Sequence, residues 1–363
     1  MILRGMLCAL FLLAVTSPSF AEPSKKSPRK KADAPIAFEI PSPAYVTLKL
    51  VRDDAVHDEL ELTNEQLANV KEAVAKVDEP LWVLRDTPLD RCGEQVDALL
   101  EQLRGDVQKA ISADQWKRLE EIILQARGFK ALRSPEIRDA LKLSDGQLAK
   151  IQKVLDTPSA AASSNDSAKA SKKSTKPIDP KRVYEILNEE QQTKLFAMFG
   201  RPFDLTSVTQ IGCVAPEFRK VDDWMNGDEV TCDSFRGKVT VIHFWTFGCI
   251  NCIHNLPHYQ DWRERFAQKD VAIIGFHTPE TDAEHNLDNV RKAVREKGIK
   301  WTVAVDTDSE NWKAWGNHTW PSVYLVDKKG RVRYWWYGEM NWQGAKGEEF
   351  MRKKIEELTK EKS

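Results

Sequence analysis

Long hydrophobic runs are nearly absent from this sequence of 363 residues. The one clear run, residues 5–15, is eleven residues long, whereas a bilayer-spanning helix needs roughly 20. An excess of charge of one sign is also lacking, because the net charge is −1 and no long basic block contains interleaved aromatic residues. We therefore expect a mature chain that does not span a membrane and has no nucleic-acid partner.

The short apolar run lies in a segment with the pattern of a secretory signal. A positively charged start, Met1 to Arg4, precedes the run, and Ser19-Phe20-Ala21 places small residues three and one before a cut. The pattern predicts a signal peptide at residues 1–21, with a membrane anchor as the alternative. Cleavage after Ala21 would give a soluble protein exported to the periplasm or another extracytoplasmic space, where disulfides are permitted.

Two segments are poor in apolar residues and rich in lysine. Residues 22–37 predict a basic tether, and residues 157–181 predict a disordered insert rich in Ala, Ser and Lys. Between and after them a five-residue signature recurs, which predicts helix starts with capping boxes. Its cap and glutamine positions are Thr63 and Gln66, Ser112 and Gln115, Ser144 and Gln147, and Asn188 and Gln191.

Apolar residues at helical spacing follow these signatures, so residues 38–206 are expected to form a small helical domain interrupted by the insert. The signatures resemble the LTxxQ motif of Spy/CpxP-like periplasmic helical proteins, some of which act as chaperones. The resemblance covers only the short motifs. It leaves open a plain helical scaffold and a chaperone-like, client-binding function with a redox domain attached.

The predicted secondary structure changes after about residue 207, where strands are expected to alternate with helices. Asn226-Gly227 is a tight-turn signal between residues 221–224 and 230–231, which predicts a hairpin. The remaining pattern predicts an α/β sheet flanked by helices. The expected strands are 239–245, 271–276, 301–305, 323–326 and 332–337, and the expected helices are 250–267, 288–297 and 348–358.

The motif with the clearest chemistry is Cys249-Ile250-Asn251-Cys252, at the end of an apolar strand and the start of a helix. Helix N-termini carry free N–H groups and the positive end of the dipole, and thiols there have pKa values from about 3.5 to 7.5. Two intervening residues let the second sulfur reach the first. The pattern therefore predicts a catalytic pair that cycles between dithiol and disulfide without a cofactor.

Three other uses of the cysteine pair fit the sequence less well. A c-type haem site needs His directly after the second cysteine, but Ile253 stands there. Zinc could recruit His254 and His258, although no second CxxC exists and the spacing differs from that of zinc fingers. A purely structural disulfide also remains open. We expect no bound metal.

The chain around the motif resembles thioredoxin-fold proteins. Residues 241–252 are similar to their active-site strand and elbow, Pro257 stands where thioredoxins kink this helix, and Trp320-Pro321 matches the cis-proline loop. Residues 212–218 resemble the start of TlpA-like and AhpC/TSA-type redoxins. The segments 275–280 and 315–321, with the Cys-Ile-Asn-Cys motif, resemble the C-terminal thioredoxin-like domain of DipZ proteins. The resemblance implies a thioredoxin-like domain over residues 207–363.

The resemblance also implies a function. In it Cys249 would attack the disulfide of a protein substrate, Cys252 would resolve the mixed disulfide, and a membrane thiol donor would supply the electrons. Thiol peroxidase activity is an alternative that fits less well. The peroxiredoxin loop Pro-x-x-x-Thr/Ser-x-x-Cys, aligned on Cys249, would place Ile242 at its proline.

Several accessory residues follow from this comparison and from their positions. His243 stands where many thioredoxins have a buried Asp, so it is a candidate proton acceptor for Cys252, with a packed core histidine as the alternative. Glu280, past the carboxyl end of a strand, is a candidate near the site. Trp320 and Pro321 are expected beside the cysteine pair, and Trp245, Trp315 and Trp320 could line a substrate groove or pack in the core.

The remaining cysteines of the mature chain are Cys92, Cys213 and Cys232. Cys213 and Cys232 flank the expected hairpin, so a structural disulfide between them is a candidate. Five mature cysteines leave one without a partner, and that one would be Cys92.

Overall fold

The computed structural model describes residues 42–156, 180–208, 212–267 and 270–361. The expected signal peptide and basic tether lie outside the described residues, as does the expected insert apart from residues 180 and 181. The described chain divides into two compact units. We call them the helical unit (residues 42–74, 100–156 and 180–208) and the sheet unit (residues 75–99 and 212–361).

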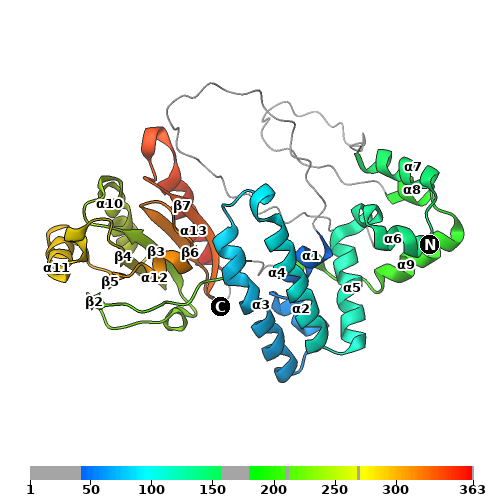
Figure 1. Ribbon diagram of the computed structural model, residues 1–363, viewed down its shortest axis with the longest axis horizontal. Helices are drawn as coiled ribbons and strands as arrows, with labels where there is room; N and C mark the ends of the chain where they lie inside the picture. The colour runs from blue at the N-terminus through cyan, green and yellow to red at the C-terminus, as the bar shows by residue number, and fades with distance from the viewer. Residues whose placement is uncertain (1–41, 157–179, 209–211, 268–269, 362–363) are drawn as a thin grey trace. The chain divides into compact units, whose positions relative to one another are not determined.

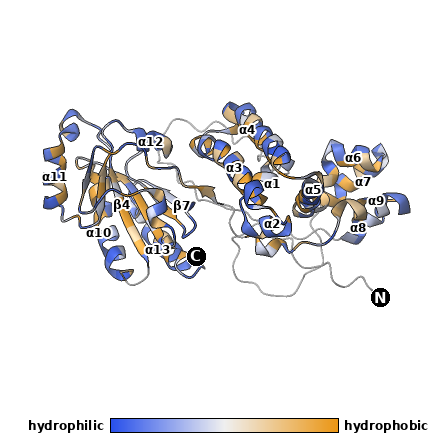
Figure 2. Cartoon of the chain, turned by 90° about the horizontal axis from the view of Figure 1, so that it is seen from below, coloured by the Kyte–Doolittle hydropathy of each residue, from blue (hydrophilic) through white to orange (hydrophobic). Residues whose placement is uncertain are grey.

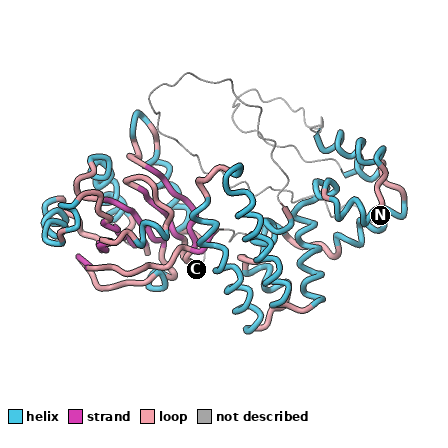
Figure 3. Tube along the Cα trace, viewed as in Figure 1, coloured by secondary structure: helices cyan, strands magenta, loops and turns pink. Residues whose placement is uncertain are grey.

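The helical unit contains only helices and loops among its described residues (Figure 3). Two long helices, α3 (Asn64–Leu84) and α4 (Leu89–Ala110), each begin or end in this unit and continue into residues 75–99. The other elements are α1 (Pro43–Leu50), α2 (Asp54–Glu59), α5 (Ala113–Arg127), η1 (Gly128–Arg133), α6 (Pro135–Leu141), α7 (Asp145–Asp156), α8 (Pro180–Tyr184), α9 (Glu189–Phe199) and η2 (Leu205–Ser207).

The four predicted capping boxes are confirmed. At each of them the glutamine N–H donates to the cap side chain and the glutamine side-chain oxygen accepts from the cap N–H. The glutamines also pair with each other. Gln66 donates to Gln115 at 2.7 Å, and Gln147 donates to Gln191 at 2.7 Å. The glutamine of each repeat therefore caps its own helix and also forms a hydrogen bond with the glutamine that caps a second helix, more than 40 residues away in the chain.

The sheet unit is built on a sheet of seven strands in the order β1-β7-β6-β3-β4-β5-β2. Strands β3, β4 and β5 run parallel, while β6, β7, β1 and β2 pair antiparallel with their neighbours. The strand bounds are β1 (Cys213–Val214), β2 (Asp223–Met225), β3 (Val239–Trp245), β4 (Val271–His277), β5 (Thr302–Val305), β6 (Ser322–Val326) and β7 (Arg331–Tyr337).

Strand β3 is buried along its whole length because side chains on both of its faces are covered. Val241 and Trp245 face one core with α10 (Ile250–Arg265), α11 (Leu287–Glu296) and α13 (Gly347–Leu358). Ile242 and Phe244 face a second core. Figure 2 shows the apolar residues of this unit gathered on the strands around β4. Short elements η3 (Cys232–Phe235), η4 (Asp282–His285), α12 (Glu310–Ala314) and η5 (Trp342–Gly344) complete the unit.

The second core includes a residue from the other end of the chain. Trp82, near the end of α3, is 5% exposed and packs with α12 and the strands. Its indole N–H donates to the carbonyl of Trp315 at 3.0 Å, and its ring meets Tyr324 and Trp335 edge-on. Among the described residues, the sheet unit therefore includes residues 75–99, whereas the sequence predicts a helical domain over all of residues 38–206.

Arg85 extends the same contact. Its guanidinium lies over the Trp82 ring and donates to the carbonyl of Gly316 and to the hydroxyl of Tyr337. Asp86 accepts a hydrogen bond from the Tyr337 hydroxyl at 2.6 Å. Residues 75–99 thus contact the segment that leads into Trp320 and Pro321.

The predicted hairpin at Asn226-Gly227 is wrong. The turn is present, with a positive φ of 61° at Asn226, but β2 before it pairs with β5 and not with residues 230–231. The Asn226 side chain donates to the carbonyls of Ile299 and Trp301, which directs the turn toward β5. A turn sequence fixes the local bend, while the partner strand is decided by packing of the whole sheet.

Candidate active site

Strand β3 ends at Trp245 and helix α10 begins at Ile250 (Figure 1). The cysteine pair lies at this junction. Cys249 is the N-cap of α10, and its Sγ accepts a hydrogen bond from the N–H of Cys252 at 3.2 Å. Because β3 is buried between both cores, its position in the sheet is fixed, and so is the position of the cysteine pair that follows it. The fold therefore places the first sulfur at the free N–H groups of a helix N-terminus, where a thiolate is stabilised.

The two cysteines differ in exposure. They are joined as a disulfide, with their Cα atoms 5.3 Å apart. Cys249 is half-buried and Cys252 is 1% exposed. Ile250, between them, is 60% exposed and carries an apolar side chain on the surface beside the pair. An incoming sulfur can thus approach Cys249, while Cys252 is reached only from within the protein.

The predicted cis-proline loop is present. The peptide bond between Trp320 and Pro321 is cis. The Trp320 ring stacks on Trp312 with centroids 3.9 Å apart, and Trp320 packs against the same core as Cys249. Trp245 and Trp315 are fully buried, so aromatic packing and not a groove accounts for both.

His243 is fully buried on the α10 face of β3. Its ring stacks on Tyr259 with centroids 4.2 Å apart, and its Nε2 accepts the indole N–H of Trp301 at 2.9 Å. Burial lowers the pKa of this imidazole to about 3. Because its basic nitrogen already accepts a hydrogen bond, this arrangement favours a packed core histidine over a proton acceptor.

Glu280, the candidate near the site, is exposed. The buried carboxylate of this region belongs to Glu284, which is 2% exposed. Glu284 accepts a hydrogen bond from the N–H of Gly248, the residue before Cys249, at 2.9 Å. Its other oxygen accepts the N–H groups of Glu280 and Thr281 at 2.8 and 2.9 Å.

Glu284 keeps its negative charge despite burial. Burial acts to raise the pKa of this carboxyl, but hydrogen bonds from the Thr246 hydroxyl and from the N–H groups of Glu280, Thr281 and Gly248 lower the pKa below its usual value. His277, fully buried on β4, lies 3.4 Å from the Thr246 hydroxyl. Burial lowers the pKa of His277 to about 4, so it is neutral around pH 7.

Sequence reasoning missed Glu284, although a signal was present. Thr281 and Glu284 have the spacing of a capping box, and the Glu284 side chain does accept from the Thr281 N–H. That pattern predicts a local cap for η4. It does not reveal that the second carboxylate oxygen reaches Gly248, which lies 36 residues earlier.

The candidate disulfide between Cys213 and Cys232 is not formed. Cys213 lies on β1 at the sheet edge, with its Sγ 3.6 Å from the carbonyl of Asp78. Cys232 begins η3, with its Sγ 3.3 Å from the carbonyl of Pro216. Since the segments flanking the Asn226 turn do not pair, nothing brings the two sulfurs together.

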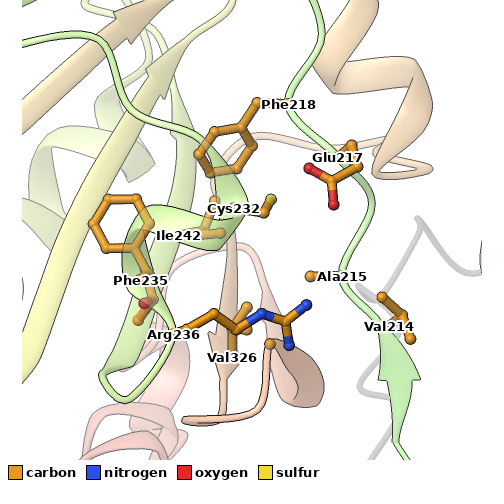
Figure 4. Close-up of a pocket in the computed structure, with 11 residues that line it drawn as sticks. Val214, Ala215, Glu217, Phe218, Cys232, Phe235, Arg236, Ile242 and Val326 are labelled. Carbon is orange, nitrogen blue, oxygen red and sulfur yellow. The ribbon is translucent and has the colours of Figure 1, made fainter. Parts of the chain in front are cut away.

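Cys232 lines a pocket on the face of the sheet that carries the second core (Figure 4). Burial, together with the charge of Glu217, raises the pKa of its thiol to about 12. This thiol therefore stays protonated. Cys92 is buried in α4, with its sulfur 3.5 Å from the carbonyls of Thr87 and Pro88.

Two absences apply to the described residues. No group of three or more His, Cys, Asp or Glu side chains among them could hold a metal ion. None of the described helices combines the length and the apolar character that a membrane span requires.

The strand order and the cysteine pair at the start of α10 are those of a thioredoxin-like fold. Residues 211–335 match the model of the AhpC/TSA family. The DipZ protein of Mycobacterium tuberculosis is 36% identical over 128 residues, which are 34% of this chain and 18% of DipZ. This chain thus aligns with less than a fifth of the length of the DipZ proteins.

A shorter relative aligns over most of its own length. The thiol-disulfide oxidoreductase YkuV of Bacillus subtilis is 29% identical over 124 residues, which are 34% of this chain and 82% of YkuV. Among solved structures, a thioredoxin-like protein in its oxidised form is 25% identical, with a TM-score of 0.37, and aligns with 41% of this chain and 97% of its own.

Proposed function

We propose that this protein is an exported thiol–disulfide oxidoreductase that acts on protein disulfides through Cys249 and Cys252. The observation that carries the proposal is the asymmetry of the pair. Cys249 is half-buried at the N-cap of α10 and Cys252 is 1% exposed behind it. The similarity to the thiol-disulfide oxidoreductase YkuV supports the reaction class, and the apolar run 5–15 supports export.

The reaction has two exchanges. In the first, the Cys249 thiolate attacks one sulfur of a substrate disulfide, forms a mixed disulfide and expels the other substrate sulfur as a thiolate. In the second, the Cys252 thiolate attacks the Cys249 sulfur, so the substrate leaves as a dithiol and the Cys249–Cys252 disulfide forms. Substrate is reduced and the enzyme is oxidised by the same two electrons. A membrane thiol donor would then return the pair to the dithiol.

Trapping of the mixed disulfide tests the roles of the two cysteines. Cys252→Ser should accumulate covalent adducts with substrate proteins on non-reducing gels, because the second exchange is blocked. Cys249→Ser should form none. Cys92→Ser serves as the matched control, since its buried sulfur takes no part and its adduct level should equal that of the unaltered protein. Equal adduct levels in Cys249→Ser and Cys252→Ser would reject the assignment.

Turnover separates this function from the peroxidase alternative. The reduced full-length protein is mixed in parallel with a disulfide-bonded protein and with hydrogen peroxide, and its own oxidation is followed by tryptophan fluorescence. We expect oxidation by the protein disulfide to be the faster by at least about tenfold, because a thiolate at a helix N-terminus suits disulfide exchange. Faster oxidation by peroxide would favour the alternative.

A further inference from the structure

We propose that Glu284 is a positioning residue that holds the loop before Cys249 and places a fixed negative charge behind this cysteine, so that the couple favours the disulfide and the protein acts as a reductant. The inference rests on the proposed function, and it assigns the direction of that reaction. It concerns a buried carboxylate that is not part of the cysteine motif.

The first step of the argument is the position of Glu284. One carboxylate oxygen accepts from the N–H of Gly248, and the Thr246 hydroxyl also donates to the carboxylate. The other oxygen accepts from two N–H groups at the start of η4. The carboxylate therefore ties both ends of the elbow between β3 and Cys249 to the loop that follows β4.

The second step concerns space. A Cβ atom added at Gly248 would lie 2.7 Å from Oε1 of Glu284, which is too close for an ordinary contact. The absence of a side chain at Gly248 lets the carboxylate approach the backbone directly before Cys249. Any larger residue at this position would push the carboxylate away from the elbow.

The third step concerns charge. The four groups that bind Glu284 are neutral donors, three N–H groups and one hydroxyl, so none of them cancels the charge. His277, on β4, is neutral around pH 7 because burial lowers its pKa to about 4. Glu280 and His285, on the same loop and turn, are exposed. On α10, His254 contacts Glu339 and not Glu284.

A negative charge held at the N–H of Gly248, the residue before Cys249, opposes the formation of the Cys249 thiolate. The N-terminus of α10 favours the thiolate, so the two effects act against each other. Redox proteins become stronger oxidants when their reduced form is stabilised. Glu284 has the reverse effect, because it destabilises the reduced, thiolate form relative to the disulfide. The couple then gives up electrons to a substrate disulfide more readily.

Glu284→Gln in the full-length protein tests the proposal, with Asp282→Asn as the matched control. Asp282 lies in the same turn and is exposed. Two quantities are measured: the rate of Cys249 alkylation by iodoacetamide as a function of pH, and the equilibrium of the couple with glutathione. For Glu284→Gln we expect alkylation at about pH 6 to be roughly three- to tenfold faster, and the glutathione equilibrium to shift toward the dithiol by a similar factor. Asp282→Asn should leave both unchanged.

Gly248→Ala is the second variant, for the case that a buried amide prevents folding. It keeps the charge but displaces it from the elbow, so both quantities should change in the same direction and by a smaller factor. A change below about twofold in a folded Glu284→Gln variant would overturn the role of Glu284. If that variant does not fold, the absence of any measurable change in Gly248→Ala would overturn it. Failure of the unaltered protein to form a reversible disulfide with glutathione would instead reject the proposed function.

Discussion

Both units combine local caps with polar contacts between distant segments, but the sheet unit also joins segments that lie much farther apart in the chain. In the helical unit each capping box joins residues three apart, and the glutamine pairs then join helix starts 49 and 44 residues apart. In the sheet unit, Glu284 joins segments 36 residues apart and Trp82 donates to a carbonyl 233 residues away. Contacts within one turn can be read from neighbouring residues, whereas contacts made by the sheet depend on its completed topology.

The largest expected effect concerns the longest of these contacts. Trp82→Ala in the full chain should lower the free energy of unfolding of the sheet unit by about 3–5 kcal/mol, because it leaves a cavity in the second core. Urea unfolding followed by tryptophan fluorescence measures the change. Val83→Ala, at a 44% exposed neighbour, is the control and should cost less than about 0.5 kcal/mol. A loss below about 1 kcal/mol for Trp82→Ala would show that residues 75–99 do not stabilise the sheet.

The next effect concerns the buried imidazoles of the sheet unit. Burial lowers the pKa of His243 to about 3 and of His277 to about 4, from about 6.5 in an unfolded chain. Between about pH 6.5 and 4 the unfolded chain therefore binds more protons than the folded one. As the pH is lowered through this range, the free energy of unfolding should decrease by up to about 1.4 kcal/mol per pH unit for each histidine.

Urea unfolding at a series of pH values measures this dependence. His243→Asn removes one of the two imidazoles, so it should remove about half of the slope. A variant with the unchanged slope would contradict the burial of a neutral imidazole at this position.

A smaller effect is expected from the glutamine pairs of the helical unit. Gln115→Ala removes the acceptor for the Ser112 N–H and the donor to the carbonyl of Leu60. We expect a loss of about 1–2 kcal/mol in the stability of the helical unit, measured by circular dichroism during urea unfolding. Gln108→Ala, at an exposed position of α4, should have little effect. Equal losses of stability in Gln115→Ala and Gln108→Ala would show that the Gln115 hydrogen bonds do not stabilise the helical unit.

The smallest effect is expected at the redox step itself. His243→Asn should leave the rate of mixed-disulfide resolution within about twofold between about pH 6 and 8, because a buried imidazole of such low pKa does not titrate there. Stopped-flow mixing with a model disulfide separates the first exchange from the second. A slower second exchange with a flatter pH profile would restore His243 as the proton acceptor for Cys252.

Local patterns predicted most of the elements. The expected strand 239–245 is β3 residue for residue, and the four capping boxes form as expected, because an apolar run and a cap both act over a few residues. The resemblance to thioredoxin-fold proteins placed the cis-proline at Pro321 correctly. Contacts between segments far apart in the chain could not be predicted from such local patterns. The Asn226 turn indicated a hairpin that the sheet does not form.

The candidate site shows the same limit. The location of Cys249 and Cys252 at a strand end and helix start followed from the motif. Glu280 and Glu284 could not be ranked, since both are acidic residues in one loop and only the folded backbone shows which carboxylate faces Gly248. The pairing of Cys213 with Cys232 failed because it depended on the hairpin.

The contact made by Trp82 has a consequence for how this protein can be divided. The family match spans residues 211–335, but the core beneath that span is closed by helix α13 on one face and by Trp82 on the other. Both lie outside the match. A fragment cut at the family borders would retain the cysteine motif and the cis-proline loop while exposing apolar surface on both faces of the sheet. The stretch of sequence shared with the family is therefore shorter than the stretch that covers both faces of this sheet.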